Sequence, residues 1–585
     1  MPGGRYKSVA YGSAHYAGGA AVPEQDNSQL ELRKMIMKVT LNKISFDITT
    51  PEGTGSLTAP LPGEIQWELT IPTEPEPPEP EPPEPEPEPP PAGWIVAPAE
   101  AGASASSAGT IDSPWTLQYA FQGAGGQVQP GATVYLRGGT YTHAADSDGD
   151  INVSGSSEAP ITFRSYPGEW AVIDAAYTGR SAVRFFGSDV ILRDVELVNS
   201  DPQRDVGQQG RSDLTYWKGP RCRLINSVLH DGGNAVGFWA ESHDSEVYGC
   251  LIYNTGMWER ANPAVTWGHS FYVQNEEGAT KKINSNVALF PFRNGLDVYS
   301  ATTAGGAGVT VEGNVLAYPG GGYKNPDEEP AVGINGTFSP GGKAEDFTFN
   351  RNVLFIPDAR HTNWMMNGAD LDHGRLECVG NEFIGGGYVT QWGHWDEAVV
   401  RENRWVGEYY LVHHATQYPV NAPGIDWDAN EYFYTYGQAP GNPEFWYRNA
   451  CHSWDQWYAD TGVDRSSTYT YSAPTDLRVL IRPNEYERGR AWIIVINHSP
   501  ETRALVSFDG LGLEPGERWE VIDAQNWPGG SILSDTYAEG SAFFLPLDRT
   551  EAPKPIGYDH QPLRDRRLNV FLVRRPLSEQ TPPEG

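Results

Sequence analysis

The chain has 585 residues, 39 % of them hydrophobic, and a formal net charge of −33 at pH 7. It contains no apolar run of about eighteen residues, which predicts that the chain does not insert into a membrane. The negative charge argues against binding to nucleic acid or to an anionic membrane surface. Because glycine and proline interrupt helices, the 65 glycines and 47 prolines favour turn-rich β structure.

The N-terminal part divides into two segments. Residues 1–72 are predicted to hold a small β module, because residues 35–48 and 64–71 alternate apolar and polar side chains as strands do. Residues 73–91 repeat proline and glutamate, which predicts an extended linker that repels itself. The first residues lack the charged start and apolar stretch of a secretory signal, so no export by that route is expected.

From about residue 94 to residue 414 the sequence repeats a short strand, a polar corner and another short strand. Successive corners are 22 to 38 residues apart, so we expect one coil per repeat, with the excess residues in loops. Asparagine at a corner tolerates a left-handed backbone, and stacked amides can hydrogen-bond to one another. The corner positions are Asp194, Ser227, Cys250, Asn286, Asn314, Asn352, Asn381 and Asn403.

This pattern predicts an all-β fold, a right-handed parallel β-helix over residues 92–473, with residues 453–469 covering its open end. The strand that follows each corner is expected to have one outward row of side chains. That row mixes rings, amides and a carboxylate, as a polysaccharide groove does, although rings that merely shield a sheet remain an alternative. The predicted outward residues are Trp239, Tyr272, Gln274, Asp297, Tyr299, Asn335 and Trp392.

Residues 474–585 contain alternating strands separated by turn signals, which predict a C-terminal antiparallel β-sandwich. The four cysteines, Cys222, Cys250, Cys378 and Cys451, show no metal-ligand spacing. We expect them to be buried reduced thiols, because a chain of this size does not need disulfide bonds for stability.

Two stretches, ATVYLRGGTYTH (132–143) and APITFRSYPGEWAVIDA (159–175), look like the opening coils of a known family. With residues 268–286 and 454–469, they make the chain resemble the right-handed parallel β-helix proteins that act on polysaccharides, including pectate-lyase-like enzymes and tailspike depolymerases. The resemblance implies a polysaccharide substrate and an extracellular or virion-associated location. Neither the full polygalacturonase motifs nor a pectate-lyase calcium cluster with its arginine is present, so no catalytic residue is carried over.

Hydrolysis of a glycosidic bond needs two carboxyl groups. Asp297 is the first choice, either as a catalytic group or as an ion-pair partner of Arg293, and its second carboxylate could be Asp231, Glu241 or Glu259. Lyase chemistry needs instead a base and a cation that neutralises the uronate. The candidates for those roles are His269, Lys281, Lys282, Arg293 and Tyr299, with Lys281 also a substrate-binding candidate.

The sequence favours a glycoside hydrolase over a polysaccharide lyase, because a strongly acidic chain repels a polyanion. A third class stays open, a non-catalytic spike or adhesin that binds glycan and attaches to a virion or surface through the N-terminal module. The run 146–150 has the spaced carboxylates and glycine of a calcium loop, or it is a solvated turn. No other cofactor is expected.

Overall fold

The computed structural model describes residues 92–205, 207, 210–259, 266–299, 306–320, 334–339, 344–357, 362–366, 373–414, 418–435 and 444–577, together with strands between residues 35 and 69. The chain divides into two compact units, Met1–Pro90 and Pro91–Gly585. In the first unit, β1 (Met35–Val39) pairs with β4 (Ile65–Leu69) and β2 (Lys43–Thr50) with β3 (Gly53–Pro60), both antiparallel. The predicted linker 73–91 lies outside the described residues.

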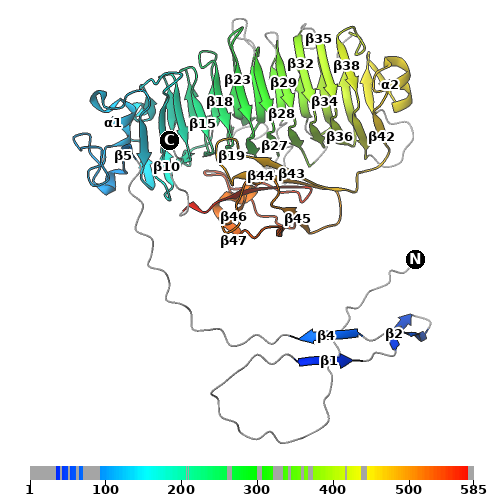
Figure 1. The fold of residues 1–585 in the computed structure, drawn as a ribbon. Coiled ribbons are helices and arrows are strands. Elements are labelled where there is room, and N and C mark those ends of the chain that lie inside the picture. Colours follow the sequence, from blue (N-terminus) through cyan, green and yellow to red (C-terminus); the bar gives the residue numbers. More distant parts are fainter. Residues whose placement is uncertain are drawn as a thin grey trace, which may run out of the picture. The chain divides into compact units, whose positions relative to one another are not determined.

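Within the described part of the second unit, three sheets of twelve strands each form a β-helix, which confirms the predicted fold (Figure 1). The chain visits the sheets in turn, and all strands of the three sheets are parallel except β41. Sheet I contains β5 (Trp94–Val96), β6 (Thr133–Leu136), β9 (Ile161–Ser165), β12 (Val190–Arg193), β15 (Arg223–Ile225), β18 (Ser245–Tyr248), β23 (Lys281–Asn284), β26 (Val309–Glu312), β29 (Phe347–Asn350), β32 (His373–Val379), β35 (Trp395–Arg401) and β38 (Ile425–Asp428).

Sheet II contains β7 (Gly139–Thr142), β10 (Ala171–Asp174), β13 (Val195–Val198), β16 (Val228–His230), β19 (Leu251–Tyr253), β24 (Val287–Leu289), β27 (Val315–Ala317), β30 (Val353–Phe355), β33 (Glu382–Ile384), β36 (Arg404–Gly407), β39 (Glu431–Tyr434) and β42 (Thr468–Thr470). Sheet III contains β8 (Asp150–Ile151), β11 (Val183–Phe185), β14 (Thr215–Trp217), β17 (Val236–Phe238), β22 (His269–Val273), β25 (Asn294–Tyr299), β28 (Ile334–Ser339), β31 (Thr362–Met366), β34 (Tyr388–Trp392), β37 (Tyr410–His414), β40 (Phe445–Tyr447) and β41 (Ala450–His452).

The predicted amide ladder runs along the corner between sheets I and II. The side-chain amide of Asn286 donates to Asn314 Oδ1 at 3.0 Å, and Asn314 donates to Asn352 Oδ1 at 3.1 Å. The series continues through Asn381 and Asn403 to Asn430, which the prediction did not include. Because all of these amides are buried, the ladder satisfies polar groups that no water reaches.

The left-handed residue at each of these corners is the one before the asparagine, so the first of the two predicted reasons for asparagine, tolerance of a left-handed backbone, is wrong. Ser285 has φ +55°, Arg351 +55° and Glu402 +57°, each directly before a ladder residue. Asp194 is likewise a left-handed residue, with φ +58°, and the ladder position of its coil is Val195, whose amide donates to Ser227 Oγ. The asparagines are therefore selected by hydrogen bonding between coils.

The two ends of the β-helix are covered by short helices. Helix α1 (Leu117–Phe121) packs at the N-terminal end, where Phe121 is buried against Phe163. Helix α2 (Trp454–Thr461) lies at the other end, as predicted, and buries Trp457 against Trp427 and Phe445. No helix among the described residues is long and apolar enough to cross a membrane.

The C-terminal strands form an antiparallel five-stranded sheet and a separate two-stranded ribbon. One apolar cluster joins the five-stranded sheet to sheet II, and another joins it to the ribbon. Figure 1 shows these strands along one side of the coils. The sheet contains β43 (Leu477–Pro483), β44 (Ala491–Asn497), β49 (Leu568–Arg574), β46 (Arg518–Asp523) and β47 (Ser531–Thr536), and the ribbon contains β45 (Arg503–Ser507) and β48 (Ala542–Pro546).

The cysteines are free thiols, as predicted. Cys222, Cys250 and Cys378 are buried, and burial raises the pKa of the Cys222 and Cys250 thiols to about 12. The prediction is wrong for Cys451, which is exposed on the last strand of sheet III. That strand has no further coil to cover it.

Candidate functional site

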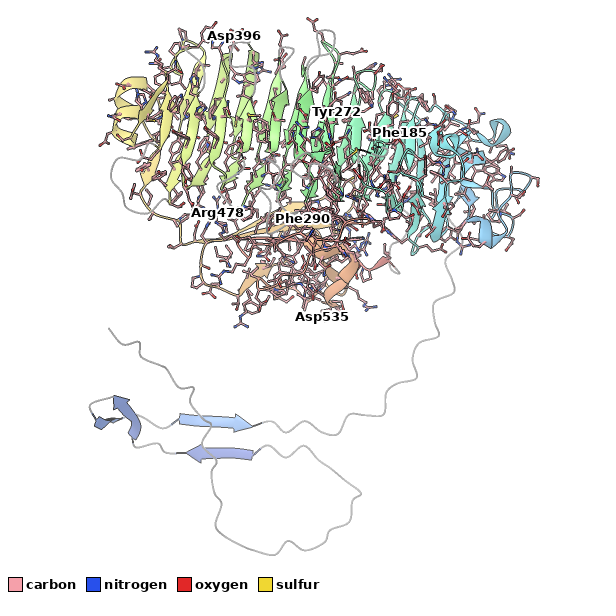
Figure 2. The ribbon with its side chains drawn as sticks, turned by 180° about the vertical axis from the view of Figure 1, so that it is seen from behind. Phe185, Tyr272, Phe290, Asp396, Arg478 and Asp535 are labelled. Carbon is pink, nitrogen blue, oxygen red and sulfur yellow. The ribbon has the colours of Figure 1, made fainter. Side chains whose placement is uncertain are left out.

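The outer faces of sheets II and III differ in what covers them. On sheet II, outward side chains such as Val228 and Leu251 pack with Ile494 of the C-terminal sheet. Figure 2 shows Phe290 where the coils meet the C-terminal strands, and Tyr272 on coils away from that boundary. The C-terminal sheet therefore covers outward side chains of sheet II and lies away from Tyr272 on sheet III.

Five rings at or next to consecutive strands of sheet III form an aromatic column: Phe186, Tyr216, Trp239, Tyr272 and Tyr299. Their successive ring centroids are 6.3, 5.8, 5.3 and 5.7 Å apart. Phe186 is 41 % exposed and the other four are partly exposed, so part of each ring remains accessible to a ligand. The predicted placement of Trp239, Tyr272 and Tyr299 on one outer face is confirmed.

Tyr272 lies at the centre of the candidate site. The Gln274 amide donates to the Tyr272 hydroxyl at 3.2 Å, so the two predicted binding residues are in contact. Burial raises the pKa of Tyr272 to about 12, and the charges of Asp297 and Asp213 act in the same direction. The phenol therefore stays protonated and can donate a hydrogen bond.

Asp297 lies on the outward row of β25 directly beside Tyr272 of β22. It is only 6 % exposed, so the prediction of a solvent-facing carboxylate is wrong. Its Oδ2 lies 3.4 Å from His269 Nε2. Its predicted ion-pair partner, Arg293, places its guanidinium 5.4 Å from the ring of Trp267.

His269 enters the site from the first position of β22. Burial, and then the nearby charge of Arg293, lower the pKa of His269 to about 3. The imidazole is therefore neutral in the ordinary pH range, and its contact with Asp297 joins a neutral ring to a carboxyl group. Among the described residues, His269 Nδ1 has no hydrogen-bond partner.

Sequence reasoning missed Asp213, which lies just before β14. Asn234 donates to Asp213 Oδ1 at 2.7 Å, and the Trp239 indole donates to Oδ2 at 3.3 Å. Asn234 Oδ1 in turn accepts the His269 amide at 2.8 Å. Burial outweighs these hydrogen bonds and raises the pKa of Asp213 to about 6.

The Asp213 carboxyl group fills a space left open by Gly237. A Cβ atom added at Gly237 would lie 1.9 Å from Asp213 Oδ2. Gly237 pairs with Tyr272, and Tyr272 pairs with Asp297. Two strand spacings, about 9–10 Å, therefore separate the strand beside Asp213 from the strand of Asp297, with Tyr272 on the strand between them.

One sequence signal could have marked the space that Asp213 fills. A glycine inside a strand often marks a place where another group approaches closely, and Gly237 stands at an outward position between two tyrosine positions. What the sequence does not reveal is which loop residue fills that space. Asp213 itself looks like any acidic residue of a solvated loop.

Glu241, a predicted partner carboxylate, lies near the aromatic column but is exposed. It pairs with Lys218 at 2.6 Å, and this hydrogen bond lowers its pKa, so Glu241 stays ionised. Lys218 Nζ lies 5.7 and 5.5 Å from the rings of Tyr216 and Trp239. The pair thus adds one cation and one anion to the edge of the site.

Asp231, another predicted partner, lies outside the site. It is 2 % exposed, pairs with the buried Arg204 and is 2.7 Å from His230 Nδ1. Its Oδ1 also accepts the Ile556 amide of the C-terminal part at 2.9 Å. Asp231 therefore holds the C-terminal part against the coils. Glu259 follows the short β20 (Met257–Trp258), outside the strands of sheet III.

Three predicted substrate-binding residues are buried. Trp392 is 1 % exposed and donates to Thr390 Oγ1 inside the coils, because the true register of β34 is one residue away from the predicted one and turns Gln391 outward. Asn335 is fully buried and donates to Asn363 Oδ1 at 2.7 Å, in a second amide contact between coils.

Lys281, the third, is fully buried, while the adjacent Lys282 is exposed on sheet I. Its Nζ donates to the carbonyl oxygens of Phe238, Trp239 and Gln274. Burial lowers the pKa of Lys281 well below its usual range. The side chain therefore joins the ends of two strands of sheet III and does not reach a ligand.

The predicted calcium run does not gather its carboxylates around one point. Asp146 pairs with Arg180 at 3.1 Å, and Asp150 pairs with Arg184 at 2.5 Å. Asp148 accepts the amides of residues 144 and 145. Across the described residues, no group of three or more acidic, histidine or cysteine side chains is arranged to hold a metal ion.

Comparison with known proteins finds a curated relative that matches part of this chain. A curated relative, pectate lyase PEL9 of Emericella nidulans, is 36 % identical over 123 residues, which are 21 % of this chain and 26 % of that protein. The chain thus spans about a quarter of the length of that relative.

Two solved structures show a weaker similarity to this chain. The crystal structure of pectate lyase Pel9A is 15 % identical, with a TM-score of 0.40 over 62 % of this chain and 81 % of that chain. A GH136 lacto-N-biosidase from Eubacterium ramulus is 14 % identical, with a TM-score of 0.36 over 65 % and 67 %. The predicted resemblance is confirmed at the level of the family model, because residues 95–349 match the Pel9A-like right-handed β-helix region.

Proposed function

We propose that this protein binds a polysaccharide along the outer face of sheet III and hydrolyses one of its glycosidic bonds. The observation that carries the proposal is the pair of carboxyl groups, Asp213 and Asp297, on either side of Tyr272. Hydrolysis with inversion uses two carboxyl groups about 6.5–9.5 Å apart. Two strand spacings bring the pair close to the upper end of that range.

The two carboxyl groups differ in environment, as an acid and a base must. Asp213, with its pKa raised to about 6, can donate a proton to the leaving-group oxygen. Asp297 would accept a proton from water as that water attacks the anomeric carbon. The bond to the leaving oxygen then breaks, and each new end carries a hydroxyl group.

The neighbouring residues have supporting roles in this proposal. Tyr272, Trp239 and Tyr299 would stack on sugar faces, and Gln274 would orient the Tyr272 hydroxyl. His269 would act as a positioning residue for the Asp297 carboxyl group. Lys218, Glu241 and Arg293 would contact sugar hydroxyl or carboxyl groups at the edges.

The test of this assignment is the pH dependence of cleavage. An acid with a pKa of about 6 is active in its protonated form, so kcat/KM should fall as the pH rises through about 6. Asp213→Asn should lower kcat by about 10²–10⁴-fold and remove this limb. Asp396→Asn, a change at an exposed carboxylate of sheet I that is labelled in Figure 2, is the matched control. Unchanged turnover in Asp213→Asn would contradict the assignment.

A polysaccharide lyase acting on a uronate is the second candidate, favoured by the pectate lyase relative. A base of the site would then take the proton next to the uronate carboxyl group, which Arg293 would neutralise, and Asp213 would protonate the leaving oxygen. The product would contain a carbon–carbon double bond with ultraviolet absorbance. Hydrolysis creates none, so the product separates the two candidates.

A further inference from the structure

A second group of rings lies on the outer face of sheet III, towards its C-terminal end. We call Tyr388, Tyr410, His413 and Trp446 the distal patch. Tyr388 stacks on Tyr410 at 5.4 Å, and His413 stacks on Trp446 at 5.6 Å. The two stacked pairs meet edge to face, with 4.8 Å between Tyr388 and His413 and 5.9 Å between Tyr410 and Trp446.

The distal patch is in register with the candidate site. The outward row that contains Tyr272 and Asp297 continues through the paired residues of β28, β31 and β34 to His413 of β37 and Trp446 of β40. Asp297 and His413 are thus four strand spacings apart, about 19 Å. Strand pairing thus places the candidate site and the distal patch on one line along the helix axis.

We propose that the distal patch is a second subsite for the same glycan, so that the protein binds long chains more tightly than short ones. This inference rests on the proposed function. A glycan segment held at Tyr272 would continue towards α2 and stack sugar faces on the rings of Tyr388 and Trp446. A short oligosaccharide that fills only the first site cannot span about 19 Å.

The chemistry of the patch suits a sugar. Its rings are partly exposed, with Tyr388 38 % exposed, and the patch combines ring faces with a phenol, an imidazole and an indole N–H. Sugars present both C–H faces and hydroxyl groups, so such amphipathic rings recognise them. The patch contains no aliphatic side chain, which distinguishes it from the aliphatic cluster between sheet II and the C-terminal sheet.

The test measures binding rather than cleavage. The full chain with Asp297→Asn is titrated with polygalacturonate, xylan and galactomannan, and with short oligosaccharides of each. Adding Trp446→Ala or Tyr388→Ala should weaken the affinity for the long chain by about 2- to 12-fold and leave that for short oligosaccharides unchanged. Trp446→Phe should keep most of the affinity. Tyr458→Ala, at a tyrosine of α2 that is 47 % exposed, is the matched control.

The outcomes separate this inference from the proposed function. Tyr272→Ala should weaken the affinity for both long and short ligands. If Tyr272→Ala has this effect but Trp446→Ala and Tyr388→Ala change neither affinity, the second subsite is refuted and the first site stands. If Tyr272→Ala has no effect, or none of the three glycans binds, the proposed function fails and this inference fails with it.

Discussion

The outer faces of sheets II and III come from the same coils but carry different side chains. Sheet II presents aliphatic residues such as Val287, Val315 and Val353, and the C-terminal sheet buries them. Sheet III presents rings and carboxyl groups, and at Tyr272 and Asp297 these are arranged in register across neighbouring strands. The first face thus contributes to stability, and the second is the one on which we propose that a glycan binds.

The difference has a physical basis in the spacing of stacked coils. Parallel strands lie about 4.8 Å apart, so a side chain on one coil always contacts the same position on the next. Aliphatic side chains in such a row create a continuous apolar surface that another sheet must cover. Rings and carboxyl groups in such a row create a repeating polar surface that a polymer can follow.

The largest effect is expected at the reacting groups. Asp297→Asn should lower turnover by about 10²–10⁴-fold and change the free energy of unfolding little, because the amide keeps the shape of the carboxyl group. Steady-state kinetics and chemical denaturation measure the two quantities. Full turnover in the variant would exclude Asp297 from the reaction.

The opposite result is expected on the face of sheet II. Ile494→Ala removes a fully buried side chain from the interface with the coils, which should lower the free energy of unfolding by about 2–5 kcal/mol. Turnover per folded molecule should be unchanged. A large loss of turnover without a loss of stability would contradict the proposal that sheet II contributes to stability and sheet III to turnover.

Gly237→Ala should affect the site more than the fold. The new Cβ would displace the Asp213 carboxyl group, so turnover should fall by up to about 10²-fold. The cost in stability should be small, because the displaced atom is the end of a side chain that is not fully buried. Gly278→Ala, at a glycine with no atom within 4 Å of an added Cβ but with φ +79°, controls for glycine replacement alone.

Lys281→Met should produce the smallest of these effects. Removing the amine leaves carbonyl oxygens of Trp239 and Gln274 without this donor, which should cost about 1–3 kcal/mol in the free energy of unfolding. Because Trp239 belongs to the aromatic column and Gln274 contacts Tyr272 of that column, KM should rise more than kcat falls. An unchanged KM would show that Lys281 has a purely structural role.

The sequence predicted the features that repeat. The asparagine corners, the coil formed by each repeat and the outward placement of Trp239 and Tyr272 follow from periodicity, because every coil shows the same pattern again. The inward and outward alternation of a single strand has no such repetition to support it. The prediction for β34 was therefore one residue off and placed Trp392 on the wrong face.

Contacts between residues that are far apart in the sequence could not be predicted, for a different reason. Lysine is a hydrophilic residue, so the sequence did not predict that Lys281 is buried. The three carbonyl oxygens that accept hydrogen bonds from its amine come together only in the folded chain. Asp213 reaches the site from a loop through the space above Gly237. Such contacts depend on which loop lies over which strand, and no local pattern encodes that.

The most direct test of glycan hydrolysis on sheet III is a product analysis. The full chain is incubated with neutral and uronate polysaccharides, and each digest is measured for new reducing ends and for the ultraviolet absorbance of an unsaturated product. Hydrolysis at Asp297 predicts new reducing ends without absorbance, and the loss of these reducing ends in Asp297→Asn. Absorbance that rises together with the reducing ends would contradict hydrolysis and establish a lyase, and binding without either signal would establish a non-catalytic glycan-binding protein.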